Sequence, residues 1–568
     1  MAPHHHIDRG GTVAIAIHPG TGIGLATSDH HWSVSTTDPL TVLGELNSES
    51  SPRWVWWGRE TTAQLAKAGL PIDRGWDVLA VHRFLHGGWR TSIGEAWAKL
   101  HDLPPDTMPK MGQLGLLDQP ADEGNRDDPV QPDGHLRPEW VNGSYRDSPE
   151  RLATWADLAR QAAEVQEQQL ARLPDPDRAI STARSESAAE LLCAEMAHHG
   201  LPINEHEALR LIGEAAGPRP QSTAHEDEIR AQRDEAVLTH LTPGQNVKLR
   251  NPAEVKAMLR RQGLDLPDTR AWRLEQLRDT EPLIDALLTW RKAERIATTY
   301  GYPWLDEHVR DGRLRGDWSS SDGAAGRMTA SVGLHNLPTT MRPVVQAETG
   351  HVFVRADLGQ IEPRVLAAVS GDPSLIAATH GDDLYQPVAE RLGVERDIAK
   401  VAVLGAMYGA TTGESAHALA GLTKNYPIAM GFLDEAAEQG RLSRDVITSG
   451  GRRIRMWTDP SVEGDLDRAI TVAASRGRYA RNALIQGAAA EFFKIWAITV
   501  RRRSRPFNAQ IVLCLHDELL VHVPTEHSEE VATLVAEAVS EAAHYWSPEP
   551  TVSFIADVSI VKSWAEAK

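Results

Sequence analysis

Two acidic segments of this chain lie within, or at the end of, apolar runs that are typical of strands. Asp357 ends the run that begins at Val352, and Asp517 and Glu518 interrupt the run 511–523. A buried carboxylate costs roughly several kcal/mol unless a positive charge compensates it. Mg²⁺ is suited to that role because it takes oxygen ligands and leaves room for substrate phosphates. Two acidic positions that converge on two ions predict phosphoryl transfer between a hydroxyl and a triphosphate.

A helix is predicted between these segments, over residues 395–409, with Gly409 as its stop signal. Its residues spaced by four share one face: Arg396, Lys400, Leu404 and Tyr408. Arginine and lysine are the donors that triphosphate oxygens need. We therefore expect a triphosphate, a base and a sugar to lie along this face.

Each pattern also has an ordinary structural interpretation. Asp357 alone fits a strand end or a helix cap. A helix face with Arg and Lys is usually solvated, and His516 alone fits a buried, hydrogen-bonded histidine. The functional interpretation depends on the complete set, in order along one chain.

The set resembles motifs A, B and C of the family A DNA polymerases, the bacterial DNA polymerase I type. The residues that match these three motifs are Asp357 to Arg364, then Arg396, Lys400, Tyr408 and Gly409, then His516, Asp517 and Glu518. Two shorter stretches also match the family, namely Gly326 to Thr329 with His335 to Pro338, and the helix carrying Arg478, Asn482, Gln486 and Gly487. The resemblance covers about residues 180–568.

The resemblance implies roles for these residues. Asp357 and Asp517 would bind two Mg²⁺ ions, which Mn²⁺ can replace, with Glu518 as nearby support. Arg396 and Lys400 would hold the triphosphate, and Lys400 could donate a proton to the leaving group. The partners implied are dNTPs and primer–template DNA.

The remaining implied roles concern the nucleotide and the DNA. Glu362 would fill the space of a ribose 2′-hydroxyl, and Gln360, Leu404 and Tyr408 would complete the nucleotide site. Contacts with primer–template DNA would come from Arg327, Asn336, Arg478, Asn482, Gln486 and His516.

The fold implied is an α/β, exonuclease-like (RNase H-like) domain over residues 1–178, then a mainly helical right-hand polymerase over 179–568. We expect the thumb at about 179–315, the fingers at about 386–469, and the palm, with its antiparallel sheet, at about 316–385 and 470–568. A stretch rich in Ala, Glu and Gln predicts a helix over 149–173. Capping residues and glycine stops predict further helices over 187–199, 205–215, 226–239, 252–262 and 281–300. The polar, Pro- and Gly-rich stretch 118–150 predicts a loop.

The expected exonuclease-like domain lacks the acidic pair that a 3′–5′ exonuclease carries on its first strand. His18 and Gly20 stand at those positions, at the end of the candidate strand that starts at Thr12. Asp77 and Asp157 match later motifs, but two carboxylates are too few to hold two metals. We expect a domain kept as scaffold, and no 5′-nuclease domain.

Three positions depart from the family pattern. Leu404 replaces an aromatic residue that stacks on the incoming base and sugar, a loss of about 1–3 kcal/mol if base–aromatic stacking is the guide. Leu358 and Gly359 replace Tyr-Ser. Pro363 replaces leucine and suits a first helical turn, where no N–H is needed. These changes affect rate and selectivity more than chemistry.

Composition sets outer limits. The chain has 568 residues, a length that indicates several domains. It has only two cysteines, which indicate a reducing, cytoplasmic location, and its formal net charge is −19. No apolar run is long enough for a transmembrane helix, and residues 1–6 lack the apolar core of a signal peptide. Acidic bulk charge does not exclude DNA binding, because local basic patches such as Arg501 to Arg505 decide it. We expect a nucleoid-associated monomer with no membrane partner.

The sequence therefore predicts a template-directed DNA polymerase with a degenerate exonuclease-like domain. One alternative is a primer–template-binding protein with little catalysis, motivated by Leu404 and the N-terminal domain. The other is a bifunctional 3′–5′ exonuclease and DNA polymerase, which needs carboxylates that the first strand does not supply.

Overall fold

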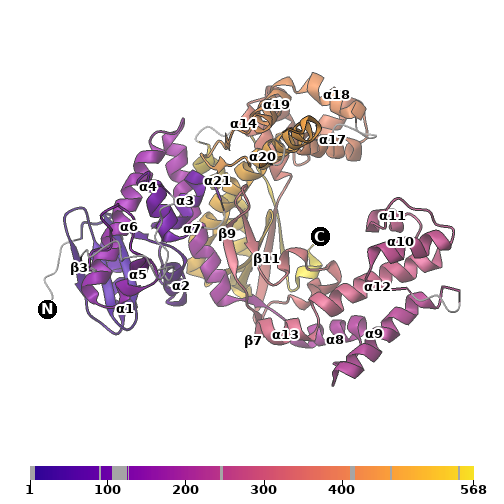
Figure 1. Cartoon of the computed structure of the whole chain (residues 1–568), viewed down its shortest axis with the longest axis horizontal. Coiled ribbons are helices and arrows are strands. Elements are labelled where there is room, and N and C mark those ends of the chain that lie inside the picture. The colour runs from indigo at the N-terminus through magenta and orange to yellow at the C-terminus, as the bar shows by residue number, and fades with distance from the viewer. Residues whose placement is uncertain are drawn as a thin grey trace. The chain divides into compact units, whose positions relative to one another are not determined.

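The computed structural model describes residues 7–88, 91–104, 125, 127–242, 247–409, 416–460, 464–547 and 551–567. The chain forms two compact units, each built from several segments. The first unit comprises Met1–His199, Asp317–Thr329 and Gly350–Ile560. The second comprises Gly200–Gly316, Ala330–Thr349 and Val561–Lys568. Figure 1 labels their elements.

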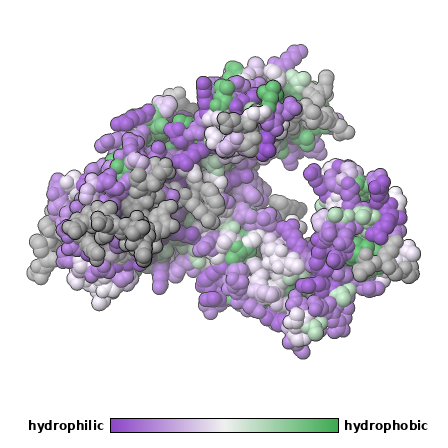
Figure 2. All heavy atoms as spheres, in the orientation of Figure 1, coloured by the Kyte–Doolittle hydropathy of each residue, from purple (hydrophilic) through white to green (hydrophobic). Residues whose placement is uncertain are grey.

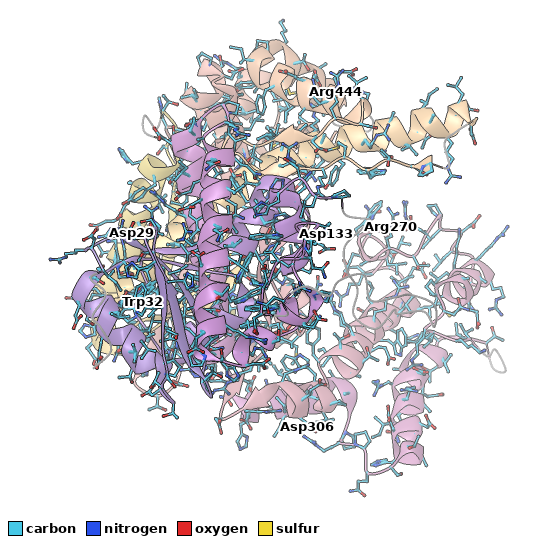
Figure 3. All side chains as sticks on the ribbon, turned by 60° about the vertical axis from the view of Figure 1, so that its left-hand side comes forward. Asp29, Trp32, Asp133, Arg270, Asp306 and Arg444 are labelled. Atoms are coloured by element: carbon cyan, nitrogen blue, oxygen red, sulfur yellow. The ribbon has the colours of Figure 1, made fainter. Side chains whose placement is uncertain are left out.

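The N-terminal part of the first unit is built on a mixed five-stranded sheet, in agreement with the α/β expectation. Its strand order is β3-β2-β1-β4-β5. The strands are β1 (Thr12–His18), β2 (Gly22–Ala26), β3 (His31–Val34), β4 (Arg53–Trp56) and β5 (Gly75–Asp77). β1 pairs antiparallel with β2 and parallel with β4. Trp32 marks the edge strand β3 in Figure 3.

Helices cover both faces of this sheet. The helix α6 (Pro149–Leu170) packs on β1 and β2, and α7 (Pro176–His199) packs against β5. The close approach of α6 requires Gly24, because a Cβ there would lie 2.1 Å from the Leu152 carbonyl carbon. The shorter helices are α1 (Pro39–Ser50), α2 (Arg59–Lys67), α3 (Val78–His86), α4 (Ile93–Leu100) and α5 (Pro138–Val141).

The stretch predicted as a loop, 118–150, is only partly described. Residues 118–124 and 126 lie outside the described residues. The rest is not simply a loop, because α5 is followed by a 3₁₀ turn, η2 (Ser144–Arg146). Their buried aromatic residues, Trp140 and Tyr145, belong to the apolar core of the domain. Local polarity hid this small core contribution.

The second sheet of this unit has four strands in the order β14-β15-β11-β16. They are β11 (His351–Leu358), β14 (Gln510–Leu515), β15 (Glu518–Pro524) and β16 (Ala556–Val561). β15 runs antiparallel to both β11 and β14. The apolar run 511–523 is therefore a tight hairpin rather than one strand, and Asp517 lies in its turn. The helices α20 (Leu466–Ser504) and α21 (Ser528–Trp546) pack on each other beside this sheet.

A helical region follows β11 in the same unit. It contains α14 (Ile361–Ser370), α15 (Pro373–Ala378), α16 (Tyr385–Leu392), α17 (Arg396–Tyr408), α18 (Ala416–Asn425) and α19 (Pro427–Arg441). The predicted stop of α17 is confirmed, because Gly409 adopts the left-handed conformation at φ 70°. Two short hairpins complete this part of the unit, β9 (Trp318–Asp322) with β10 (Arg327–Ala330) and β12 (Val446–Ile447) with β13 (Arg453–Ile454).

The second unit is mainly helical, in agreement with the mainly helical pattern expected from residue 179 onward. Its helices are α8 (Glu205–Ala216), α9 (Thr223–Leu238), α10 (Pro252–Arg261), α11 (Ala271–Glu275), α12 (Pro282–Thr299) and α13 (Tyr302–His308). Side chains of Asn204 and Asn251 cap α8 and α10, which begin at the predicted residues. Ser222 caps α9, which begins at Thr223, three residues before the predicted start at 226. A small sheet, β6 (Leu201–Pro202), β8 (Arg313–Leu314) and β7 (Val309–Arg310), accompanies them.

In the part of the chain that the structure describes, one helical stretch, Leu466–Phe507, has the length and apolar composition of a membrane span. However, 89% of its most apolar window is buried inside the protein, as in the core helix of a folded domain. The visible face in Figure 2 is mostly hydrophilic, with small apolar patches.

Candidate active site

The predicted metal-binding carboxylates meet where β11 ends beside the β14–β15 turn. Asp357 is directly opposite Glu518 in the β11–β15 register, and the Leu358 N–H donates to the Asp517 carbonyl at 2.9 Å. The turn is tight, with His516 in the left-handed conformation at φ 57°. Two segments 160 residues apart thus bring the acidic side chains together, as the sequence predicted.

The electrostatics of these carboxylates favour a bound cation. Burial, and then the nearby Asp517 charge, raise the pKa of Asp357 to about 7. Burial also raises the pKa of Asp517. Carboxylate oxygens are the ligands that a hard divalent ion prefers, and the positive charge of such an ion would favour the ionised form of both acids. Asp357 and Asp517 therefore fit Mg²⁺ or Mn²⁺.

Arg355 lies among the same carboxylates, and our sequence analysis missed it. It precedes Asp357 by two positions on β11, so both side chains project from the same face of the strand. Its guanidinium donates to Glu518 at 2.8 Å, to Asp357 at 3.1 Å and to Asp557 at 3.3 Å. An arginine two positions before a candidate metal ligand was the signal that could have revealed it.

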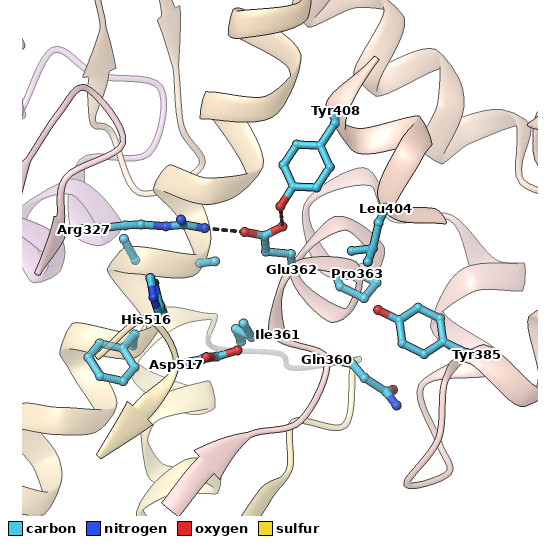
Figure 4. A pocket seen from close by; sticks show the side chains of 13 residues that line it. Arg327, Gln360, Ile361, Glu362, Pro363, Tyr385, Leu404, Tyr408, His516 and Asp517 are labelled. Carbon is cyan, nitrogen blue, oxygen red and sulfur yellow. Dashed lines mark hydrogen bonds and ion pairs between the residues drawn. The ribbon is translucent and has the colours of Figure 1, made fainter. Parts of the chain in front are cut away.

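A cavity of about 240 Å³ adjoins Asp517 (Figure 4). Its walls come from the start of α14, from α16 and α17, from α20 and from the β14–β15 turn. The lining side chains labelled in Figure 4 are Arg327, Gln360, Ile361, Glu362, Pro363, Tyr385, Leu404, Tyr408, His516 and Asp517. Six of the predicted site residues beyond the metal ligands, from the three motifs and the stretch before them, therefore line one cavity: Arg327, Gln360, Glu362, Leu404, Tyr408 and His516.

Glu362 is held in the middle of this cavity by two partners (Figure 4). One carboxylate oxygen accepts from Arg327 at 2.5 Å, and the other accepts from the Tyr408 hydroxyl at 3.2 Å. Burial raises the pKa of Glu362, and the Arg327 charge opposes that rise. Pro363 sits in the first turn of α14, where the missing N–H leaves no helical hydrogen bond unmade.

The four residues spaced along α17 divide into two pairs. Leu404 and Tyr408 line the cavity, whereas Arg396 and Lys400 are not among its lining residues. Arg396 donates to Asp383 at 2.6 Å and lies 5.7 Å from the Tyr385 ring centre. Lys400 is exposed.

Gln360 and Tyr385 link α14 to α16. The Gln360 side chain donates to Asp383 at 2.9 Å and accepts from the Leu384 N–H at 2.8 Å. Tyr385 follows directly and lines the cavity, and burial raises its pKa to about 12. We did not predict Tyr385 from the sequence, because its segment matches none of the motifs used.

The predicted DNA-contacting residues fall in both units. On α20, Arg478 is exposed and donates to Ser475 at 3.1 Å, and Asn482 and Gln486 are half-buried further along the same helix. Burial, and then the Arg327 charge, lower the pKa of His516 at the hairpin turn. Asn336 belongs to the second unit, where its carbonyl accepts from Arg295.

The basic run Arg501–Arg505 is not the open cationic patch that the sequence suggested. All four arginines are paired with acidic side chains of the same unit, which are Glu195, Glu541, Glu537 and Asp73. Neutralised arginines attract phosphate far less than free ones. The run therefore fastens α20 to its neighbours.

In the N-terminal domain, the two carboxylates that match exonuclease motifs, Asp77 and Asp157, are both bonded to protein groups. Asp77 is fully buried, caps α3 through the Ala80 N–H at 2.9 Å and accepts from Trp56 at 3.0 Å. Burial raises its pKa to about 6. Asp157 is paired with Arg160 at 2.7 Å. His18 ends β1, and Gly20 lies in the turn that follows.

Comparison with known proteins agrees with this architecture. A profile described as DNA polymerase family A matches residues 222–566. The thermostable DNA polymerase I of Thermus filiformis is 30% identical over 328 residues, which are 52% of this chain and 38% of that protein. DNA polymerase I of Chloroflexus aurantiacus is 32% identical over 299 residues, 47% of this chain and 31% of that protein. The matched region is thus less than two fifths of either relative.

The fold has a counterpart of nearly the same extent among solved structures. The polymerase domain of Pol1 from M. smegmatis superposes with a TM-score of 0.68 and covers 98% of this chain and 95% of that one, at 21% identity. The chain therefore has the family A polymerase fold, preceded by a mixed N-terminal sheet. Since the family profile also matches well over half of its residues, the chain belongs to DNA polymerase family A.

Proposed function

We propose that this chain is a template-directed DNA polymerase that adds deoxynucleotides to a primer 3′-hydroxyl. The observation that carries the proposal is the meeting of Asp357 and Asp517 beside a cavity walled by Glu362, Leu404 and Tyr408. The similar M. smegmatis structure is described as a complex with DNA primer–template and dNTP, which supports the same partners here.

In this proposal, Asp357 and Asp517 hold two divalent ions, Mg²⁺ or Mn²⁺, with Glu518 in support. The ions would lower the pKa of the primer hydroxyl and offset the charge that develops on pyrophosphate. Arg396 and Lys400 would bind the triphosphate, and Lys400 would protonate the leaving group. Arg396 must first exchange its Asp383 partner for phosphate oxygens.

The cavity residues would select the nucleotide. Glu362, fixed between Arg327 and Tyr408, would leave no space for a ribose 2′-hydroxyl. Leu404 would pack on the incoming base, and Tyr385 lines the same cavity and would add the aromatic surface that Leu404 lacks. Arg478, Asn482, Gln486, His516 and, in the second unit, Asn336 would contact primer–template DNA.

We assign residues 1–178 to an exonuclease-like scaffold and 179–568 to the polymerase, with thumb, palm and fingers at the limits given above. The segment from Thr12 to Gly20 contains no carboxylate, and the two acids that match later exonuclease motifs, Asp77 and Asp157, are already engaged by Trp56 and Arg160. A two-metal site needs more carboxylates than these two. The protein should not digest a labelled mismatched primer without nucleotides. Digestion that is lost in Asp77→Ala would instead establish a bifunctional enzyme.

Primer extension on a defined template tests the main proposal. We expect the added nucleotide to follow the template base in the presence of Mg²⁺ and no addition in EDTA. A tight primer–template complex without extension in Mg²⁺ or Mn²⁺ would support the alternative of a DNA-binding protein with little catalysis.

A further inference from the structure

Arg355 gives the carboxylate cluster a cation of its own. Its side chain is only 10% exposed, and it donates separate hydrogen bonds to three carboxylates. One of them, Asp357, is a proposed metal ligand, and the other two are Glu518 and Asp557. A guanidinium has five donors in a rigid fork, so it can satisfy several acids at once without an ion.

The carboxylates around Arg355 are not gathered as a metal would gather them. Among the described residues, no three of Asp357, Asp517, Glu518 and Asp557 have oxygens that all lie within 4.8 Å of one another. Asp357 is repelled by the nearby Asp517 charge, and its Oδ2 accepts a hydrogen bond from Arg355 at 3.1 Å. A divalent ion at Asp357 would have to take this oxygen from Arg355 or share it.

We propose that Arg355 is a built-in counter-ion that competes with divalent metal for Asp357 and so keeps metal affinity low in the nucleotide-free protein. This inference rests on the proposed polymerase function. When metal and triphosphate arrive together, Arg355 can release Asp357 at little cost because Glu518 and Asp557 remain as partners. Arg355 is thus a positioning residue that makes metal occupancy depend on the nucleotide.

Direct binding of Mn²⁺ to the full chain, without nucleotide or DNA, tests the proposal by electron paramagnetic resonance or calorimetry. Arg355→Met removes the charge but keeps an unbranched stem, and it should tighten Mn²⁺ binding roughly tenfold, the low end of the effect of a charge within about 6 Å. Arg355→Lys restores the charge and should return the affinity toward the wild-type value. Arg503→Met, which removes a paired arginine on α20, should leave the affinity unchanged.

Two further variants settle the outcome. Asp357→Asn in the Arg355→Met background should abolish the gained affinity, which places it at this site. If Arg355→Met does not fold, Arg355→Gln, which keeps a donor for Glu518, takes its place. Unchanged or weaker Mn²⁺ binding in the neutral variants would overturn the proposal. The proposal would also be overturned if neither Arg355→Met nor Arg355→Gln folds at saturating Mg²⁺. A bound metal could then not take the place of the Arg355 charge, as the proposal requires.

The polymerase proposal is judged separately, by primer extension with the wild-type protein. The polymerase function alone would be rejected if the wild-type protein extends no primer while Arg355→Met still binds Mn²⁺ more tightly than the wild-type protein. Normal extension with unaltered Mn²⁺ affinity in the neutral variants would reject the role of Arg355 alone.

Discussion

The Arg327 guanidinium and the Glu362 carboxylate are joined at 2.5 Å across the candidate nucleotide cavity. Glu362 belongs to the first turn of α14, and Arg327 belongs to β10, which precedes it by more than thirty residues in the sequence. The Tyr408 hydroxyl completes the arrangement from α17. A side chain held from two sides cannot easily rotate away from a ligand, which is the property that a steric filter requires.

Glu362→Ala should relax discrimination between sugars. Removing the fixed carboxylate opens space where a 2′-hydroxyl would lie, and we expect the ratio of rNTP to dNTP incorporation to rise about tenfold or more. Tyr408→Phe removes only the hydroxyl that holds Glu362 and should produce a smaller rise. Steady-state incorporation of matched rNTP and dNTP measures both. A wild-type ratio in Glu362→Ala would mean that Glu362 has a structural role only.

Asp357→Ala and Asp517→Ala should each abolish nucleotide incorporation while duplex binding survives. Loss of a charge-stabilising group at a reacting centre costs roughly 10²–10³-fold in rate, and loss of a metal ligand should cost at least that. Primer extension with Mg²⁺ or Mn²⁺, together with a DNA-binding assay, measures both effects. The control is Asp29→Ala, an exposed carboxylate before β3 (Figure 3). Substantial extension by either variant would contradict the metal assignment.

Lys400→Ala and Arg396→Ala should have different kinetic effects. Lys400→Ala removes the proposed proton donor to the leaving group, so it should lower the rate at saturating nucleotide by roughly 10²-fold. Arg396→Ala should mainly raise the apparent nucleotide dissociation constant, by about tenfold for one lost charged hydrogen bond. Single-turnover kinetics separate the two. Lys424→Ala, an exposed lysine on α18, is the control. Wild-type kinetics in both variants would show that this face of α17 does not meet the triphosphate.

Leu404→Phe should tighten nucleotide binding. An aromatic ring at this cavity wall would restore stacking on the base, which contributes about 1–3 kcal/mol elsewhere, or roughly 5- to 150-fold in affinity. Leu404→Ile, which keeps an aliphatic side chain of equal size, should leave affinity near the wild-type value. Pre-steady-state titration with dNTP measures the change. Equal affinity in Leu404→Phe and wild type would indicate that Tyr385 already supplies the aromatic contact.

Asp357→Asn should stabilise the metal-free protein at pH 8. The pKa of Asp357 is raised to about 7, so its contribution to stability is present at low pH and is lost as pH rises toward and through 7. The gain should be about 1 kcal/mol, since partial exposure screens much of the shift. Urea unfolding in EDTA at pH 5 and pH 8 measures it. Asp383→Asn should have the opposite sign at pH 8, because Asp383 has a lowered pKa. No gain at pH 8 would contradict the assigned cost of ionising Asp357, which comes first from its burial and then from the nearby Asp517 charge.

Much of the site could be predicted from local sequence. Capping side chains at Asn204 and Asn251 marked helix starts, and Gly409 marked the end of α17, because these signals act within a few residues. The acidic positions 357 and 517 were visible because carboxylates in strand-forming runs are rare. The motif residues around these acidic positions carried the family resemblance and the expected chemistry.

Only the tertiary structure decided which side chains meet. The sequence could not predict that Arg355 contacts Asp557, about two hundred residues away, or that Arg327 and Tyr408 hold Glu362 from two elements. It also left open that Asp517 sits in a turn and that the arginines at the C-terminal end of α20 are already paired. Pairing and register depend on long-range packing and on charges brought together from distant segments. Short sequence windows do not encode these contacts, whereas they do encode caps, periodicity and motif residues.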